Sequence, residues 1–234
     1  MKTIIIDAPR PEDVSDIQTV FYKTWLATYP NEEAGITRED IEDKFKDAFS
    51  EETLQKRRES MSKFPDNIQV RVARDGDRVV GISRSVKRSD VNQLQTIYVL
   101  PEYQGQGIGH MFWKESLQFF NDKKDIIVHV VTYNQPAIEF YKKLGFVDTG
   151  KRFTEERHMM KSGAFFPEME MTFKRSKNPT VILFGVVSLI LSRIFFLFIN
   201  DPEGPNLLVV VGLVLIIFSL CYGILYLWKR NKLS

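Results

Sequence analysis

Two long apolar segments near the end of the chain constrain its fold more than any other feature. Residues 179–199 carry a single charge, Arg193, and residues 207–228 carry none. A helix rises about 1.5 Å per residue, so each segment could span roughly 30 Å, the thickness of the hydrocarbon core of a bilayer. Residues 200–206, between them, contain two prolines, one glycine and two acids, which favour a turn. These segments predict a transmembrane helical hairpin.

Basic residues at both outer ends of the predicted hairpin indicate its orientation. The turn has none, whereas the flanks carry Lys174, Arg175 and Lys177 before the first span and Lys229, Arg230 and Lys232 after the second. The positive-inside rule then places both chain ends in the cytoplasm and the turn outside. We expect a two-span protein of the cell membrane, with the lipid bilayer as a partner, a basic linker at 175–178 and a cytoplasmic tail at 229–234.

Two features of the predicted hairpin have alternative interpretations. The segments could be buried core helices, but core helices of small soluble proteins are seldom apolar around their whole circumference. Arg193 lies six residues before the end of the first segment, at 199. It would snorkel towards the outer interface or make a polar contact between helices.

The remaining residues, 1–174, have the composition of a globular domain that binds no nucleic acid. They carry 26 Lys and Arg against 28 Asp and Glu, whereas a nucleic-acid-binding domain normally has a basic excess. The single cysteine of the chain excludes an intrachain disulfide and a multi-cysteine metal site. His110, His129 and His158 share no metal-ligand spacing, so no metal is expected. His129 is interpreted as a packed or exposed strand residue.

Hydrophobic periodicity divides residues 1–174 into helices and strands. Helices are expected to begin at Pro11, to run from Thr37 through Phe49, and to cover 51–63, 110–122 and 137–143. Strands are expected at 3–7, 68–74, 79–86, 94–99, 126–132, from 146 onwards and at 168–173. Three consecutive strands predict an antiparallel meander, and helices alternate with the later strands. This order predicts an α/β fold of the α+β type, a mixed sheet with helices on its faces.

A glycine-rich loop lies between the strand at 94–99 and the helix at 110–122. Its residues are Gln104, Gly105, Gln106, Gly107, Ile108 and Gly109. Glycines allow a tight turn with several backbone N–H groups around one hollow, and the following helix adds the positive end of its dipole. The loop is therefore a candidate phosphate-binding site. A P-loop would continue with Lys and Ser or Thr, and a Rossmann turn would follow the first strand of a parallel sheet, so neither fits.

The loop resembles the acetyl-CoA loop of the GCN5-related N-acetyltransferase (GNAT) family, whose pattern is Gln/Arg-x-x-Gly-x-Gly/Ala. A later block, Asn134-x-x-Ala137-x-x-Phe140-Tyr141-x-x-Leu144-Gly145-Phe146, is also typical of that family. The two blocks have the family's order and separation, and the resemblance covers about residues 3–174. It looks closest to the bacterial polyamine-acetyltransferase-like branch. The resemblance implies a mostly antiparallel GNAT sheet, a domain at 1–174 and acetyl-CoA as co-substrate, without a metal.

The resemblance also implies roles for particular residues. The N–H groups of Gln104 to Gly109 would hold the pyrophosphate of CoA, and Asn134 would contact CoA. The strand edge formed by Ile97, Tyr98 and Val99 would pair with the pantetheine arm. A backbone N–H of this edge would polarise the thioester carbonyl. Tyr141 would protonate the departing thiolate.

The proton acceptor is where the sequence departs from many members of the family. An amine must be neutral to attack a thioester, and alkyl ammonium groups have pKa values near 10, so a base is needed. Family members often carry a glutamate on the strand that here has Gln93 and Gln95 and no carboxylate. Asp90, Glu102 or a chain of water molecules could serve instead.

The acceptor of the acetyl group is expected to bind near Trp25 and Tyr29, at the first helix–helix connection, although Trp25 also lies on the apolar face of its helix.

Two functions remain open. The first is a membrane-tethered N-acetyltransferase that acetylates a small amine, such as a polyamine, or a protein amine. The alternative is a non-catalytic acyl-CoA-binding sensor or regulatory module at the membrane. The sequence leaves a homodimer open.

Overall fold

The computed structural model describes residues 3–61, 64–120, 123–155 and 159–175. The chain divides into two units, Met1–Arg175 and Ser176–Ser234. The predicted spans at 179–199 and 207–228, with their turn and tail, therefore lie outside the described residues. Among the residues that are described, no helix is long and apolar enough to cross a membrane.

Five α-helices and seven strands make up the described part of the chain. The helices are α1 (Val14–Thr28), α2 (Arg38–Phe45), α3 (Glu51–Met61), α4 (Ile108–Phe119) and α5 (Gln135–Lys143). Short 3₁₀ helices cover Pro11–Asp13 (η1) and Pro101–Tyr103 (η2). The strands are β1 (Ile4–Asp7), β2 (Ile68–Asp75), β3 (Arg78–Lys87), β4 (Asn92–Val99), β5 (Ile126–Val131), β6 (Val147–Phe153) and β7 (Glu168–Phe173).

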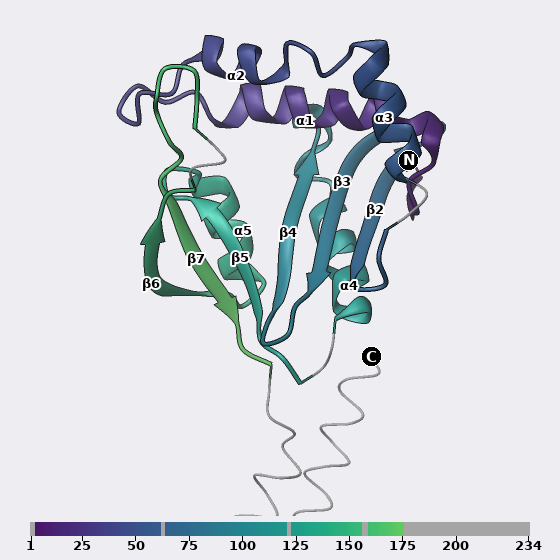
Figure 1. Cartoon of the computed structure of the whole chain (residues 1–234). Coiled ribbons are helices and arrows are strands. Elements are labelled where there is room, and N and C mark those ends of the chain that lie inside the picture. The colour runs from purple at the N-terminus through teal and green to yellow at the C-terminus, as the bar shows by residue number, and fades with distance from the viewer. Residues whose placement is uncertain (1–2, 62–63, 121–122, 156–158, 176–234) are drawn as a thin grey trace, which may run out of the picture. The chain divides into compact units, whose positions relative to one another are not determined.

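The strands form one sheet in the order β1-β2-β3-β4-β5-β7-β6. Every neighbouring pair is antiparallel except β4 and β5, which are parallel. Figure 1 shows β4 and β5 close together at one end and separated at the other. The mixed, mostly antiparallel sheet expected from the sequence is confirmed.

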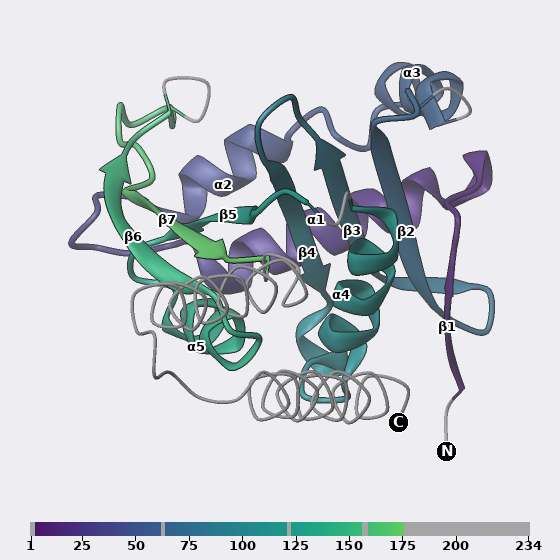
Figure 2. The same cartoon turned by 90° about the horizontal axis from the view of Figure 1, so that it is seen from below.

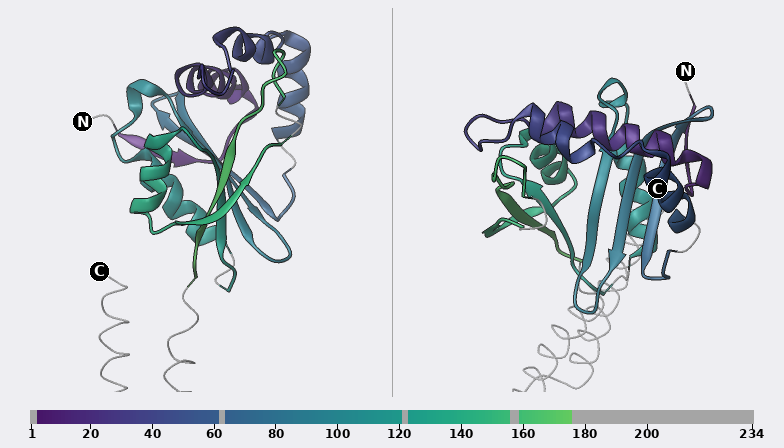
Figure 3. Two further views of the ribbon diagram at one scale, coloured as in Figure 1. Left: turned by 90° about the vertical axis from the view of Figure 1, so that its left-hand side faces the viewer. Right: turned by 45° about the horizontal axis from the view of Figure 1, so that its top comes forward.

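Helices cover both faces of this sheet. Figure 2 shows α1, α2 and α3 on one face and α4 and α5 on the other, and the left panel of Figure 3 shows the same layers from the side. The right panel of Figure 3 shows α1 crossing the strands. The fold is therefore a three-layer sandwich with the sheet in the middle.

The core lies on both sides of the sheet because its central strands are apolar on both faces. Val72 of β2 and Val80 of β3 are fully buried and belong to one cluster with Val20 of α1 and Phe112 of α4. A second cluster packs α4 and α5 against β5 and β7, and a third surrounds the connection between α1 and α2. These clusters hold the helices that carry the predicted site residues.

The start of α2 agrees with the sequence, whereas its end does not. Thr37 and Asp40 form the expected capping box, with the Asp40 N–H donating to Thr37 Oγ1 (3.1 Å) and the Thr37 N–H donating to Asp40 Oδ2 (3.0 Å). The helix ends at Phe45 instead of continuing to Phe49. The chain tightens into turns there, and both phenyl rings pack against Tyr22 of α1, at 5.5 and 6.2 Å.

A buried ion pair joins η1 to the sheet. Arg74 of β2 donates from Nη1 to Asp13 Oδ1 (2.7 Å) and from Nη2 to Asp13 Oδ2 (2.5 Å). Both side chains are less than a tenth exposed. This two-point geometry fixes the start of α1, which begins at Val14, relative to β2.

Candidate active site

The separation of β4 from β5 creates an unpaired strand edge. The two strands pair only at Asn92 with Ile126 and at Gln93 with Ile127. Beyond this point, the edge of β4 that faces β5 pairs with no other strand among the described residues. Main-chain groups on such an edge can pair with an extended ligand as an added strand would. Ile97, Tyr98 and Val99, predicted to pair with pantetheine, all lie on this part of β4.

A β-bulge bends β4 where it leaves β5. In the β3–β4 register, Arg84 is opposite Thr96 and Ser85 is opposite Leu94, so Gln95 is an extra residue of β4. A bulge disrupts the ladder locally and increases the twist of its strand. It therefore turns β4 away from β5 and widens the opening between them.

The glycine-rich loop follows the open end of β4. Gly105 and Gly107 have φ angles of 74° and 82°, in the left-handed region that favours glycine. Gln104 Nε2 donates to Val99 O (3.0 Å), which holds the loop against the end of β4. A Cβ atom placed on Gly105 or on Gly107 would meet nothing within 4 Å. The loop thus encloses open space beside the first turn of a helix.

Helix α4 begins earlier than the sequence suggested. Gly107 is its N-cap, and Ile108 and Gly109 belong to its first turn instead of to the loop. Because Gly107 adopts a left-handed conformation, the chain turns there and the helix can begin at Ile108. Gly109 is also a close-approach position, because a Cβ there would lie 3.0 Å from the ring of Phe140 on α5. The first N–H groups of α4 have no acceptor within the helix and carry its positive dipole end.

These features fit a pyrophosphate. The loop provides backbone N–H groups, positive-φ glycines without side chains and a helix N-terminus, which together attract an anion. The two flexible glycines let the main chain approach closely. Gln104 to Gly109 are therefore brought together as one candidate cofactor site.

Tyr141 is held at the other wall of the opening. It lies on α5, is 6% exposed and packs against the rings of Phe140 and Phe146. Burial, together with the nearby Tyr98, raises the pKa of the Tyr141 phenol well above its ordinary value of 10. The hydroxyl therefore stays protonated at neutral pH, as a proton donor must.

Asn134 is the N-cap of α5. Its Oδ1 accepts a hydrogen bond from the Ala137 N–H (3.2 Å), and Pro136 follows within the first turn. This cap explains why the helix that carries Tyr141 starts at Gln135. A contact of Asn134 with CoA remains a prediction.

Trp25 and Tyr29 lie in the cluster around the α1–α2 connection. Their rings are 5.1 Å apart, and both pack against Phe166. Tyr29 is almost fully buried, yet its hydroxyl lies 3.0 Å from that of Tyr98 on β4. This contact connects Tyr29, which is predicted to bind the amine acceptor, with Tyr98, which is predicted to bind the cofactor. Trp25 makes its ring contacts within the core.

The two carboxylates suggested as proton acceptors lie just before and just after β4. Asp90 is exposed in the turn between β3 and β4. Glu102 is on η2 and pairs with Arg78 (3.3 Å). Instead, two other residues meet where β4 and β5 separate: His129 of β5 is directly opposite Glu170 of β7. Sequence reasoning missed both, although strand alternation places His129 on the same face as Ile127.

Among the described residues, no group of three or more His, Cys, Asp or Glu side chains could hold a metal ion.

Comparison with known proteins shows what this unit is similar to. Residues 36–146 match the model of the acetyltransferase (GNAT) family. The crystal structure of the PaiA N-acetyltransferase from Thermoplasma acidophilum in complex with coenzyme A has the same fold, with a TM-score of 0.55 and 22% identity over 73% of this chain and 99% of that one.

Two sequence relatives share shorter regions. N-acetyltransferase 8F1 of Rattus norvegicus is 33% identical over 90 residues, which are 35% of this chain and 41% of that protein. An uncharacterized N-acetyltransferase of Methanocaldococcus jannaschii is 33% identical over 64 residues, or 26% of this chain and 28% of that protein. The chain thus spans less than half of the length of either relative.

Residues 36–146, just under half of the chain, are thus similar to the GNAT acetyltransferase family, and the unit Met1–Arg175 has the fold of the coenzyme A complex from Thermoplasma acidophilum.

Proposed function

We propose that the chain is an N-acetyltransferase, tethered to a membrane by its C-terminal segments, that transfers acetyl from acetyl-CoA to an amine. The observation that carries the proposal is the continuous path from the unpaired edge of β4 to Gly107 at the start of α4. An extended pantetheine arm along that edge would bring the pyrophosphate to the glycine-rich loop.

The reaction would be a direct transfer. The neutral amine attacks the acetyl carbon, a new C–N bond forms, and the C–S bond to CoA breaks. A backbone N–H of β4 would polarise the thioester carbonyl. Tyr141, which stays protonated because it is buried, would give its proton to the departing thiolate.

The acceptor that we propose is a small cationic amine such as a polyamine, with a protein amine as the wider class. Glu155 and Glu170 would each offer a carboxylate to an ammonium group of the acceptor, in a cavity at the closed end of the β4–β5 opening whose lining also holds Arg88 and Lys151. We also propose that the chain belongs to the bacterial polyamine-acetyltransferase-like branch. Light scattering of the purified chain tests whether it forms a homodimer.

Turnover is tested with the full chain and a panel of amines. The panel contains polyamines, lysine peptides, peptides with free N-termini and aminosugars, and the readouts are free CoA thiol and the mass of the product. Transfer to at least one amine is expected. Binding of acetyl-CoA without turnover on any amine would contradict an enzyme and support the alternative, an acyl-CoA-binding sensor.

The membrane part of the proposal rests on the two apolar segments, 179–199 and 207–228, and their basic flanks. Single cysteines in a Cys221→Ser background test it with an impermeant thiol reagent on intact cells. We expect labelling in the turn at 200–206 and none at either terminus. Labelling at the termini would contradict the orientation, and recovery of the chain in the soluble fraction would contradict the tether.

A further inference from the structure

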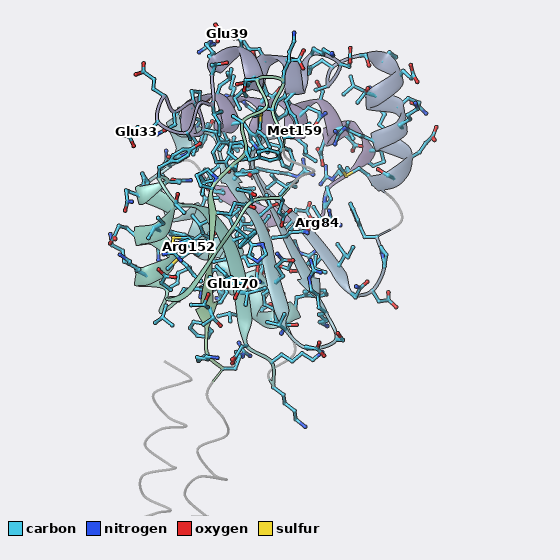
Figure 4. The ribbon with its side chains drawn as sticks, turned by 60° about the vertical axis from the view of Figure 1, so that its left-hand side comes forward. Glu33, Glu39, Arg84, Arg152, Met159 and Glu170 are labelled. Carbon is cyan, nitrogen blue, oxygen red and sulfur yellow. The ribbon has the colours of Figure 1, made fainter. Side chains whose placement is uncertain are left out.

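A polar cavity of about 490 Å³ lies at the closed end of the β4–β5 opening. Its polar lining residues are Arg88, Gln93, His129, Lys151, Glu155 and Glu170. Gln93 and Ile127 form the last pair between β4 and β5, and His129 is the next residue of β5 on the same face. His129 therefore lies where the two strands first separate. Figure 4 labels Glu170 of β7, together with Arg152 of β6 and Arg84 of β3.

Carboxylates lie on both sides of the His129 ring. Its Nε2 is 3.5 Å from Glu170 Oε2, and its Nδ1 is 3.7 Å from Glu155 Oε1. The ring packs edge-on against Phe153 of β6, with 4.7 Å between the centroids. The His129 side chain is 20% exposed, so the ring is held in place and still reaches the cavity.

Gln93 determines which ring nitrogen can accept a proton. Arg88 donates from Nε to Gln93 Oε1 (3.0 Å), and its Nη2 donates to the same oxygen. The amide nitrogen of Gln93 therefore faces His129 Nδ1, at 3.5 Å. Because an amide nitrogen only donates, Nδ1 presents its lone pair and the ring proton lies on Nε2, towards Glu170.

The charges around His129 suit a group that accepts a proton briefly. Burial lowers the pKa of His129, while Glu170 and Glu155 raise it and Lys151 of β6 lowers it further. Arg88, from the β3–β4 turn, adds another positive charge to the cavity. The net shift is downward, so the ring is neutral at pH 7. Once a proton arrives, the carboxylates on both sides stabilise the imidazolium.

We propose that His129 is a catalytic residue, the proton acceptor for the attacking amine, and that Glu170 is its positioning residue. This inference rests on the proposed acetyltransferase function. The acceptor's ammonium group gives one proton to His129 Nδ1, directly or through one water molecule, and this proton displaces the long contact from the Gln93 amide (3.5 Å). The amine nitrogen then bonds to the acetyl carbon as the C–S bond breaks, and the thiolate leaves with a proton from Tyr141. The new amide nitrogen gives up its second proton, which restores the Tyr141 phenol through solvent. The imidazolium afterwards returns its proton to solvent.

The first test compares pH profiles of the full chain and its His129→Gln variant. Wild-type kcat/KM for the amine should fall below an apparent pKa under 6.5, because His129 must be neutral. His129→Gln should lower kcat/KM by roughly 10²–10³-fold at pH 7 and remove this acidic limb. The remaining rate should rise about tenfold per pH unit as more of the amine becomes neutral. Acetyl-CoA affinity should not change.

The second test is chemical rescue. His129→Ala opens room for a free imidazole. Added imidazole should raise the rate of this variant at least tenfold, which would not be seen if the histidine were merely structural. Glu170→Gln should lower the rate less than His129→Gln does and shift the acidic limb to lower pH. Glu52→Gln is the matched control, because Glu52 is exposed on α3 and pairs with Lys56; its profile should equal that of the wild type.

The outcomes separate the two proposals. A folded His129→Gln variant with full activity and an unchanged acidic limb would overturn the role of His129 while leaving the acetyltransferase intact. An NMR titration that finds His129 charged at pH 7.5 would also overturn it, without any assay of activity. A wild-type chain that binds acetyl-CoA and acetylates no amine would overturn the proposed function, and the role of His129 with it.

Discussion

The hydroxyl oxygens of Tyr29 and Tyr98 lie 3.0 Å apart and connect the end of helix α1 to strand β4. Tyr29 also accepts a hydrogen bond at its carbonyl oxygen from the hydroxyl of Tyr133 (2.8 Å). The acceptor side of the opening is thus linked to the strand predicted to hold the cofactor. A shift of α1 would move the side chain of Tyr98 directly.

This tyrosine pair predicts a loss of stability at alkaline pH. Burial raises the pKa values of Tyr29 and Tyr98 in the folded protein above the unfolded value of about 10. Their contribution is complete below pH 10 and declines as the pH rises through the folded values, by about 1.4 kcal/mol per pH unit for each group. Urea unfolding at pH 9, 10 and 11 should show a smaller decline in Tyr29→Phe. An equal decline in the wild type and the variant would contradict this.

The glycine loop predicts a specific loss of cofactor binding. Gly107→Val places a branched side chain at a φ of 82°, with a strain of about 1–3 kcal/mol, in the space proposed for the pyrophosphate. We expect acetyl-CoA affinity, measured by calorimetry, to fall by more than tenfold. Gly76→Val is the matched control, because Gly76 has a φ of 60°, an equally open Cβ position and a place in the β2–β3 turn. Equal affinities in the two variants would rule out the loop as the site.

Tyr141→Phe tests the proton donor. The change removes one hydroxyl and almost no volume, so unfolding temperature and acetyl-CoA affinity should stay close to those of the wild type. Turnover should fall by roughly 10²–10⁴-fold, because a thiolate would have to leave without a positioned acid. Steady-state kinetics, with the amine that the wild type acetylates fastest, measure the turnover of both proteins. A variant with the wild-type kcat would show that protonation comes from elsewhere.

The buried pair of Asp13 and Arg74 predicts a large effect on stability. Asp13→Asn would leave the buried charge of Arg74, which is 7% exposed, with the longer pairing to Asp7 (3.8 Å), at a cost of up to about 3–5 kcal/mol. Denaturant unfolding measures this loss. Glu42→Gln is a suitable control, since Glu42 pairs with Arg38 on the surface of α2 and such pairs contribute little. Similar losses in the free energy of unfolding for both variants would contradict the distinction between a buried and a surface ion pair.

Much of the fold could be predicted because its signals are local. Alternation in β2 and β3, the capping box of Thr37 and Asp40 and the glycines before α4 each report on a few neighbouring residues. The cofactor loop was therefore found from the sequence, apart from the start of α4. That boundary depends on the left-handed conformation of Gly107, which the residue type permits without requiring.

The pairing of His129 with Glu170 could not be predicted in the same way. The two residues are far apart in the chain and meet only because β7 lies between β5 and β6 and pairs with β5 in one particular register. Strand alternation gives the face of each residue but not the strand beside it. The same holds for Tyr29 and Tyr98, whose contact depends on how α1 crosses the sheet.

Transfer of a labelled acetyl group tests the central claim most directly. The full chain is incubated with acetyl-CoA labelled with ¹³C in the acetyl group and with a polyamine, and mass spectrometry follows the product while thiol release is measured in parallel. The account predicts one labelled acetyl group on the amine for each CoA released, with both signals lost together in Tyr141→Phe. CoA release without labelled amine, or bound acetyl-CoA that is never consumed with any acceptor, would contradict it.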